Sequence, residues 1–300
     1  MSKFNVSNFI QNKNYPEIYH FTIQDESHAY INSLRRILCE HIPVYAASKV
    51  KIIRNESSIK DEQLAKSLKL IRFRQILNGV KIDYSQIRFE INVTATEDIK
   101  LVTSSDLKLY YKNSKNQINR NHFIPNIYLC ALDKGKTLEL IGQFEKNIEM
   151  KDGAFSCVAR VGYEEITTPS SNNIGKYQFN IHILETFTFK ELIIAACNVF
   201  NDLLDSFAKD IELHIKNNTN KPNLNYETSQ FDDTILNVVI DAIHSLYGEN
   251  IEFAAYNRHH ILTDNFTFLI NAKNYEKIIF ESIKHIKEKN NKLLSIVNSK

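Results

Sequence analysis

Near its start, the chain has an order of apolar and polar residues that predicts a strand leading into a short amphipathic helix. Residues 19–23 alternate between apolar and polar side chains, which is typical of a half-buried strand. Ser27 can cap the start of a helix, and Pro43 ends it, because a proline ring clashes with a preceding helical turn. The stripe that this helix would bury consists of Tyr30, Leu34, Ile37, Leu38 and His41.

Two adjacent arginines, Arg35 and Arg36, fall off that stripe, at the edge of the opposite face. A guanidinium presents five donors in a rigid fork, which suits the carboxylates and backbone carbonyls of a partner. Asn32, one turn earlier, can add a hydrogen bond or hold the start of the helix. We therefore expect these three residues to bind a partner. An ordinary amphipathic helix with a solvated arginine pair is the alternative interpretation.

Residues 56–174 have a different character and predict a β-rich insert. A short helix is expected over residues 61–70, and residues 89–95 alternate as a half-buried strand. Further strands are expected near residues 138–144 and 155–163. The insert therefore interrupts a domain of another kind, to which the chain afterwards returns.

After the insert, residues 177–183 alternate as a strand, and a long helix follows over residues 192–207. Thr188 and Glu191 form a capping box at the start of that helix. Residues 217–228 are polar and contain one proline, which is typical of a linker.

The second half repeats the order of helix and then strand. Asp233 precedes a helix whose apolar stripe extends from Ile235 to Leu246 and which ends at Gly248; a strand over residues 251–256 follows. A strand over 266–270 and a closing helix over 275–297 complete the chain. The two long helices each carry an apolar stripe, so we expect them to pack together. The residues expected in this contact are Leu192, Val199, Leu203, Phe207, Ile279, Ile283 and Ile286.

The stretch around the arginine pair resembles the signature of the α-like subunits of multisubunit RNA polymerases. The residues that carry this resemblance are Asp25, Asn32, Leu34, Arg35, Arg36, Pro43 and Ala46. The second half is similar to the small α-like subunit, through Asp232, Thr234, Asn237, Phe253, Ala254 and Tyr256. Ile235-Leu236 departs from the Leu-Gly that is usual before the asparagine.

The resemblance covers about residues 15–300 and implies an α+β fold with two α-like dimerisation domains in one chain. They would form an intramolecular pseudo-dimer, as in the fused pairs of nucleocytoplasmic large DNA viruses. The implied domains are an N-terminal arm (1–14), a large dimerisation domain (15–55 and 175–216), the insert (56–174), a linker (217–228) and a small dimerisation domain (229–300).

The same resemblance implies a function in transcription. The chain would be a non-catalytic platform, one copy per polymerase, that holds the largest and second-largest subunits together, with a small zinc-binding subunit as a further candidate partner. Its location would be intracellular: the host cytoplasm or virion for a virus, otherwise the nucleus. A stand-alone α+β binding or regulatory module is the alternative.

Composition adds few constraints. The 300 residues can form two or three compact domains, and a net charge of +2 gives no indication of strong direct contact with nucleic acid. No apolar run approaches the roughly 20 residues that a membrane span needs. The N-terminus also lacks the apolar region of a signal peptide.

The cysteines and histidines do not predict a catalytic or metal site. Cys39, Cys130, Cys157 and Cys197 lie far apart, so we expect reduced thiols and no zinc, although many proteins of the α-like family hold zinc in the insert. On a helix, Cys39 and His41 would point in divergent directions, which disfavours a nucleophile pair. His259, His260 and Asp264 could form a metal corner, but adjacent histidines in a turn are more often solvated. We expect neither catalytic residues nor a cofactor.

Overall fold

The computed structural model describes residues 5–77, 79–112, 117–118, 122–167, 174–217, 223–260 and 263–299. The fold is α+β, with several antiparallel sheets and five α-helices within these residues. It divides into two compact units. The first unit contains the chain up to His41, residues 160–182 and the chain from Phe189 onward; the second contains residues 42–159 and 183–188. No helix in the described ranges is both long and apolar enough to cross a bilayer.

A four-stranded sheet in the first unit has the order β1-β2-β13-β12. Its strands are β1 (Asn5–Gln11), β2 (Ile18–Ser27), β13 (Ile174–Ile183) and β12 (Val158–Thr167). The apolar face carries Phe21 and Phe179, whose rings stack at 4.8 Å between centroids. The expectation of a loose arm over residues 1–14 is wrong for residues 5–11, because β1 pairs with β2 from Asn5↔Gln24 to Gln11↔Tyr19. Val6 is the one buried residue of β1, so the sequence of this strand lacks the alternation of apolar and polar residues that would have predicted it.

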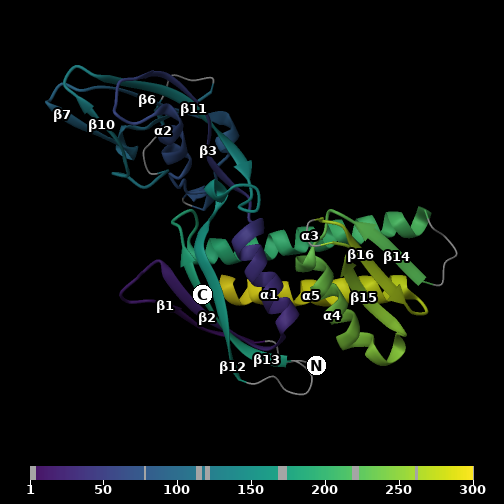
Figure 1. Ribbon diagram of the computed structural model, residues 1–300. Helices are drawn as coiled ribbons and strands as arrows, with labels where there is room; N and C mark the ends of the chain where they lie inside the picture. Colours follow the sequence, from purple (N-terminus) through teal and green to yellow (C-terminus); the bar gives the residue numbers. More distant parts are fainter. Residues whose placement is uncertain are drawn as a thin grey trace. The chain divides into compact units, whose positions relative to one another are not determined.

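The helices of the first unit are α1 (His28–Arg36), α3 (Phe189–Asn217), α4 (Asp233–Tyr247) and α5 (Tyr275–Asn298). A π-helical turn, Ile37–His41, continues α1 up to the residues before Pro43. α3 and α5 pack against each other and run side by side in Figure 1. The buried residues among those expected in this contact are Leu192, Phe207, Ile279, Ile283 and Ile286. Val199 and Leu203 are partly exposed instead, and Phe200 and Leu204, one position further along the helix, are fully buried.

A three-stranded sheet, in the order β14-β16-β15, also belongs to the first unit. Its strands are β14 (Asn223–Thr228), β16 (Phe266–Asn271) and β15 (Phe253–Arg258). The expected linker over 217–228 is therefore wrong over 223–228; residues 218–222 lie outside the described residues. Leu224 and Tyr226 are buried, while their neighbours Asn223, Asn225 and Glu227 are exposed. The Asn-rich composition hid this alternation.

The second unit is built on a five-stranded sheet, in the order β3-β11-β6-β8-β9. Its strands are β3 (Val44–Asn55), β11 (Thr137–Asn147), β6 (Ile87–Thr94), β8 (Lys108–Tyr111) and β9 (Gln117–Ile118). Two ribbons accompany it: β7 (Ile99–Thr103) with β10 (Tyr128–Asp133), and β4 (Ile76–Leu77) with β5 (Val80–Lys81). The helix α2 (Asp61–Lys69) completes the unit.

The core of the second unit contains Phe144, whose ring centroid lies 4.7 Å from that of Phe73 and 4.8 Å from that of Tyr84. The unit begins at Ile42, earlier than the expected insert boundary at residue 56. The reason is that β3, which the sequence alone assigned to the first domain, pairs along most of its length with β11.

Candidate interaction site

The helix that carries the arginine pair is fixed at both of its ends. Ser27 caps it as expected, since its hydroxyl accepts a hydrogen bond from the Tyr30 N–H at 3.3 Å. At the other end, Ile37 and Leu38 of the π-helical turn are fully buried. π-Helical turns are rare and are frequently found at functional sites. The side chains of this helix therefore project from a rigid base.

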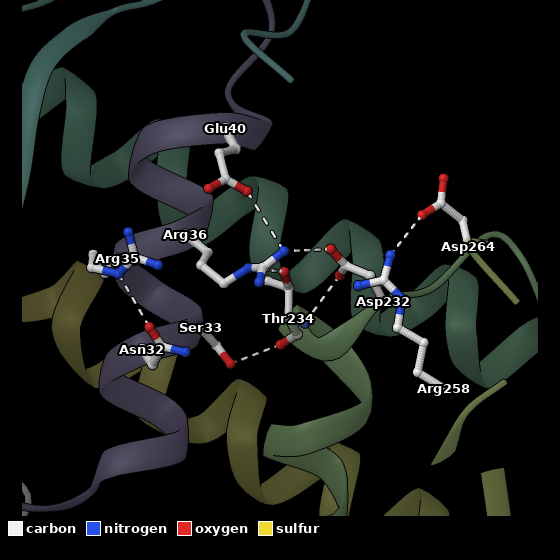
Figure 2. A network of polar contacts seen from close by, with 9 residues as sticks. All are labelled: Asn32, Ser33, Arg35, Arg36, Glu40, Asp232, Thr234, Arg258 and Asp264. Carbon is white, nitrogen blue, oxygen red and sulfur yellow. Dashed lines mark hydrogen bonds and ion pairs between the residues drawn. The ribbon is translucent and has the colours of Figure 1, made fainter. Parts of the chain in front are cut away.

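Arg36 binds the start of α4 within the same unit (Figure 2). Its Nη2 lies 2.7 Å from Asp232 Oδ2, and its Nε donates to Thr234 Oγ1 at 2.8 Å. Glu40, one turn later, places its Oε2 at 3.6 Å from Arg36 Nη2. About a fifth of the Arg36 and Asp232 side chains is exposed (22% and 23%), so the pair is largely shielded from water. Arg36 thus joins the first half of the chain to the second.

Asp232 has two roles in this contact. Its Oδ1 accepts from the Thr234 N–H at 3.0 Å, which makes it the N-cap of α4, while Oδ2 takes the guanidinium. The carboxylate therefore lies at the positive end of the helix dipole and against the guanidinium. Ser33 adds a hydrogen bond from its hydroxyl to the Thr234 carbonyl at 2.7 Å. Side chains of α1 therefore bind both the cap residue and the first residues of α4.

Within the described ranges, Arg35 forms no contact of this kind. In Figure 2 it points away from α4, and its Nε donates to Asn32 Oδ1 at 3.1 Å on the same helix. Asn32 and Arg35 are both partly exposed. Of the three residues expected to bind a partner, these two form a local pair whose other donors are available, whereas Arg36 is engaged inside the chain.

A buried ion pair joins the strand before α1 to α5. Lys289 Nζ lies 2.6 Å from Glu26 Oε1, and the two side chains are 15% and 1% exposed. Burial raises the pKa of Glu26 above its ordinary value, although Lys289 acts in the opposite direction. Lys289 also lies 5.6 Å from the centre of the Tyr30 ring. This pair fixes the position of α5 against the first half.

Next to the ion pair, buried amides continue the polar contact between the two halves. The Tyr30 hydroxyl donates to Asn290 Oδ1 at 2.9 Å, and Asn290 Nδ2 donates to Asn201 Oδ1 at 2.8 Å. Asn290 is fully buried. A buried polar residue on an apolar helix stripe favours one register and one partner, because other alignments leave its hydrogen bonds unmade.

His41 lies close to the arginine contact. Burial lowers the pKa of its imidazole, while the carboxylates of Asp232 and Glu40 act in the opposite direction. Its Nε2 is buried and has no hydrogen-bond partner within the described part of the chain. The neutral ring therefore packs as part of the helix stripe, as its spacing predicted.

The residues considered for a metal corner are held by other contacts. His259 Nε2 lies 2.5 Å from Thr267 Oγ1, and Asp264 pairs with Arg258 at 3.2 Å. The described residues contain no group of three or more His, Cys, Asp or Glu side chains that could hold a metal ion.

Several of these contacts were not predicted from the sequence. Asp232 and Thr234 entered only through the resemblance, and the partners Glu26 and Lys289 were missed. One signal was present: Asn290 falls at helical spacing between the apolar residues of α5, where a polar residue is unexpected. Its partners lie 89 and 260 residues earlier in the chain, so periodicity could not identify them.

We expect Arg36 and Asp232 to be energetically coupled. A double-mutant cycle with Arg36→Met and Asp232→Asn should give a coupling of about 1–2 kcal/mol in urea unfolding, because the pair is charge-assisted and mostly shielded. Asp232→Asn preserves a capping side chain, so the cycle isolates the charge. The pair Lys134–Asp98, whose side chains are 70% and 96% exposed, is the control and should show no measurable coupling. Equal coupling in both cycles would contradict the proposed role of Arg36.

A family model described as the RNA polymerase Rpb3/Rpb11 dimerisation domain matches residues 20–290. The chain belongs to this family. The match begins in β2, before the arginine helix, and ends within α5, so it includes both helices that the Arg36 and Lys289 contacts join to the first half.

Two curated proteins are similar to the chain over part of its length. Both are named DNA-directed RNA polymerases I and III subunit RPAC1. The Mus musculus protein is 25% identical over 226 residues, which cover 63% of this chain and 64% of that protein. The Homo sapiens protein is 26% identical over 225 residues, which cover 61% and 63%. The chain therefore spans less than two thirds of the length of these relatives.

Proposed function

We propose that the chain is a non-catalytic assembly subunit of a multisubunit DNA-directed RNA polymerase. The observation that carries this proposal is the single family match over residues 20–290, which runs through both the arginine helix and the closing helix. The names of the two similar proteins support the same assignment. The stand-alone binding module is the competing function.

The proposal includes the arrangement of the two halves. The part up to α3 would correspond to the large α-like partner, and the part from β14 to α5 to the small one. The packing of α3 on α5 supports this arrangement, as do the Arg36–Asp232 and Lys289–Glu26 contacts. In a fused chain, the two partners would always be made in equal number and would meet within the same molecule.

Within this proposal, α1 is the docking site for a large catalytic subunit. Arg36 already binds Asp232, so the contact with the partner passes mainly to Arg35, supported by Asn32. The helix is capped by Ser27 and its apolar face is buried, so Arg35 loses little further freedom on binding. Arginines on such rigid bases are frequent interface hot spots.

The test is recovery of the two large subunits with a tagged chain in its native source. Arg35→Ala should reduce their recovery by about tenfold or more, since truncating a hot-spot arginine costs about 2 kcal/mol. The urea midpoint of the purified chain should stay unchanged, because the hydrogen bond that Arg35 forms among the described residues is to Asn32 of its own helix. Arg54→Ala is the matched control: it removes an exposed arginine from β3 and should leave recovery intact.

Two results would count against the proposal. Full recovery with Arg35→Ala would remove α1 as the docking site while leaving the polymerase assignment in place. Absence of any large subunit with the unmodified chain would instead favour the stand-alone module. The masses of the recovered proteins distinguish these two failures.

A further inference from the structure

A small cavity lies on the outward face of the four-stranded sheet. Its volume is about 170 Å³, and its walls come from β2, β13 and β12. The residues that line it include His20, Arg160, Gly162, Glu164, Gln178 and Asn180. Phe21 and Phe179 point to the other face of the sheet, where their rings stack. The cavity is thus separate from the core and from the contacts of Arg36 and Lys289.

The cavity exists because position 162 has no side chain. Gly162 does not have the positive φ that favours glycine, and a Cβ there would meet only Arg160 Nε, at 3.9 Å. By contrast, a Cβ at Gly142 would lie 2.2 Å from the Phe89 ring, so packing requires that glycine. The chain contains only seven glycines. Strand glycines often mark a bulge, a bend or a place where a ligand or another backbone approaches closely, and the open space at Gly162 suits the last of these.

The cavity is surrounded by polar groups whose hydrogen bonds are unmade. Arg160 forms no ion pair or side-chain hydrogen bond with any residue that the structure describes. His20 Nδ1 is buried and likewise without a partner there. Buried polar atoms normally have a partner. Unlike His41, whose ring packs in the helix stripe, His20 lines a cavity together with Arg160, so a partner group has room there. The side-chain amides of Gln178 and Asn180 add further donors.

The surface around the cavity has the features of a protein interface. Ile10 pairs with His20 across β1 and β2, so both side chains lie on this face, and Ile10 is 57% exposed. Ile166 lies on the same face of β12, two alternations beyond Gly162, and is 48% exposed. β12 is also the edge strand of its sheet. Apolar residues therefore flank a polar depression.

We infer that this cavity receives an acidic side chain, an aspartate or glutamate, of a protein partner that docks on the outward face of the sheet. The carboxylate would take donors from Arg160, Asn180 and His20, and the apolar part of the partner would cover Ile10 and Ile166. Lys176 lies on the same face of β13, so the charges there favour an acidic partner over a basic one. Glu164 opposes the carboxylate and limits its affinity.

The size of the cavity decides between a side chain and a larger ligand. About 170 Å³ is below the roughly 300–1,000 Å³ of typical cofactor and drug-sized sites. It is enough for one carboxylate-bearing side chain. Binding to this cavity can be measured on the purified protein, whichever complex the chain joins.

The test uses the full chain labelled with ¹⁵N only in glycine, which gives seven backbone signals by NMR. Gly162→Ala identifies the signal of Gly162. Titration with N-acetyl-glutamate N-methylamide should move that signal in a saturable way, while the signals of Gly79 and Gly135 in the second unit stay fixed. N-acetyl-glutamine N-methylamide should bind about tenfold more weakly, because a charge-assisted hydrogen bond is lost.

Three variants test the assigned contacts. Arg160→Gln should weaken binding of the glutamate probe by about tenfold, and Glu164→Gln should strengthen it by about threefold. Gly162→Val fills the cavity and should abolish binding; because this variant lacks the Gly162 signal, its binding is measured by isothermal titration calorimetry against the unmodified chain. The circular dichroism spectrum and urea midpoint show whether the chain remains folded. Arg258→Gln removes a guanidinium from the three-stranded sheet and is the matched control, with no expected change.

A second probe distinguishes a protein partner from a free anion. The blocked peptide Leu-Ser-Glu-Ser-Leu places two apolar side chains on the face of its glutamate when extended, and should bind about tenfold more tightly than blocked glutamate. Inorganic phosphate binding as tightly as the peptide would indicate a small-anion site and overturn the inference. Equal binding of the glutamate and glutamine probes, or no movement of the Gly162 signal, would overturn it as well.

Discussion

Replacing Lys289 by methionine is expected to lower the free energy of unfolding by about 3–5 kcal/mol, because it leaves the Glu26 carboxylate buried without its cation. Methionine keeps most of the volume of the lysine stem, so the loss reports the charge more than the packing. The double variant Glu26→Gln/Lys289→Met should recover most of the stability, since neither side chain then carries a buried charge. Urea unfolding of the wild type, both single variants and the double variant measures this.

A second ion pair of α5, between Lys287 and Asp205, provides a matched control. Lys287 lies 2.7 Å from Asp205, but the Asp205 side chain is about half exposed (49%), so water can replace the lysine. Lys287→Met should therefore cost less than about 1 kcal/mol. A loss with Lys287→Met as large as that with Lys289→Met would contradict the explanation by burial.

The pH dependence of stability gives a second measurement on the same pair. The pKa of Glu26 is raised in the folded chain, so between its unfolded and folded values the folded state binds more protons. Stability contributed by this group therefore falls as the pH rises through that window. Glu26→Gln should remove this contribution to the slope. Lys289→Met removes the cation that lowers the pKa, so it should extend the loss of stability to higher pH.

The sequence allowed prediction of those parts of the fold that depend on local periodicity. The arginine helix, its Ser27 cap and its buried residues Tyr30 and Leu34 agree with the structure, because one face of a short helix is visible in twelve residues. The strand β14 was missed because only Leu224 and Tyr226 alternate among polar neighbours. Local pattern identifies an element only when enough of its residues are apolar.

The candidate site was predictable in its residue types but not in its pairings. Position relative to the helix stripe placed Arg35 and Arg36 on the polar side, where each could face a partner or another part of the chain. The structure separates them, because α4 begins beside Arg36 and not beside Arg35. Pairings across about 200 residues depend on the relative placement of helices, and periodicity contains no information on that placement.

Gly142→Ala is expected to destabilise the second unit by about 3 kcal/mol, because the added methyl group would lie 2.2 Å from the buried ring of Phe89. Gly142 pairs directly with Phe89 across β11 and β6, so the ring covers the space that the missing side chain leaves. The ring cannot move away freely, since it is fully buried and packs 5.2 Å from Phe144. Adding Phe89→Leu should restore part of the loss.

Hydrogen–deuterium exchange locates this effect within the chain. Amides of β6 and β11 should lose protection in Gly142→Ala, while those of α3 and α5 should keep theirs, because these helices belong to the other compact unit. Equal loss in both units would mean that they unfold together.

The matched control for Gly142→Ala is Gly162→Ala, also in a strand. A Cβ there meets only Arg160 Nε at 3.9 Å, so the substitution should leave stability unchanged or raise it by about 0.5 kcal/mol through the reduced entropy of the unfolded chain. A glycine kept for packing and a glycine kept for an outside partner thus differ in the sign of their response to the same methyl group.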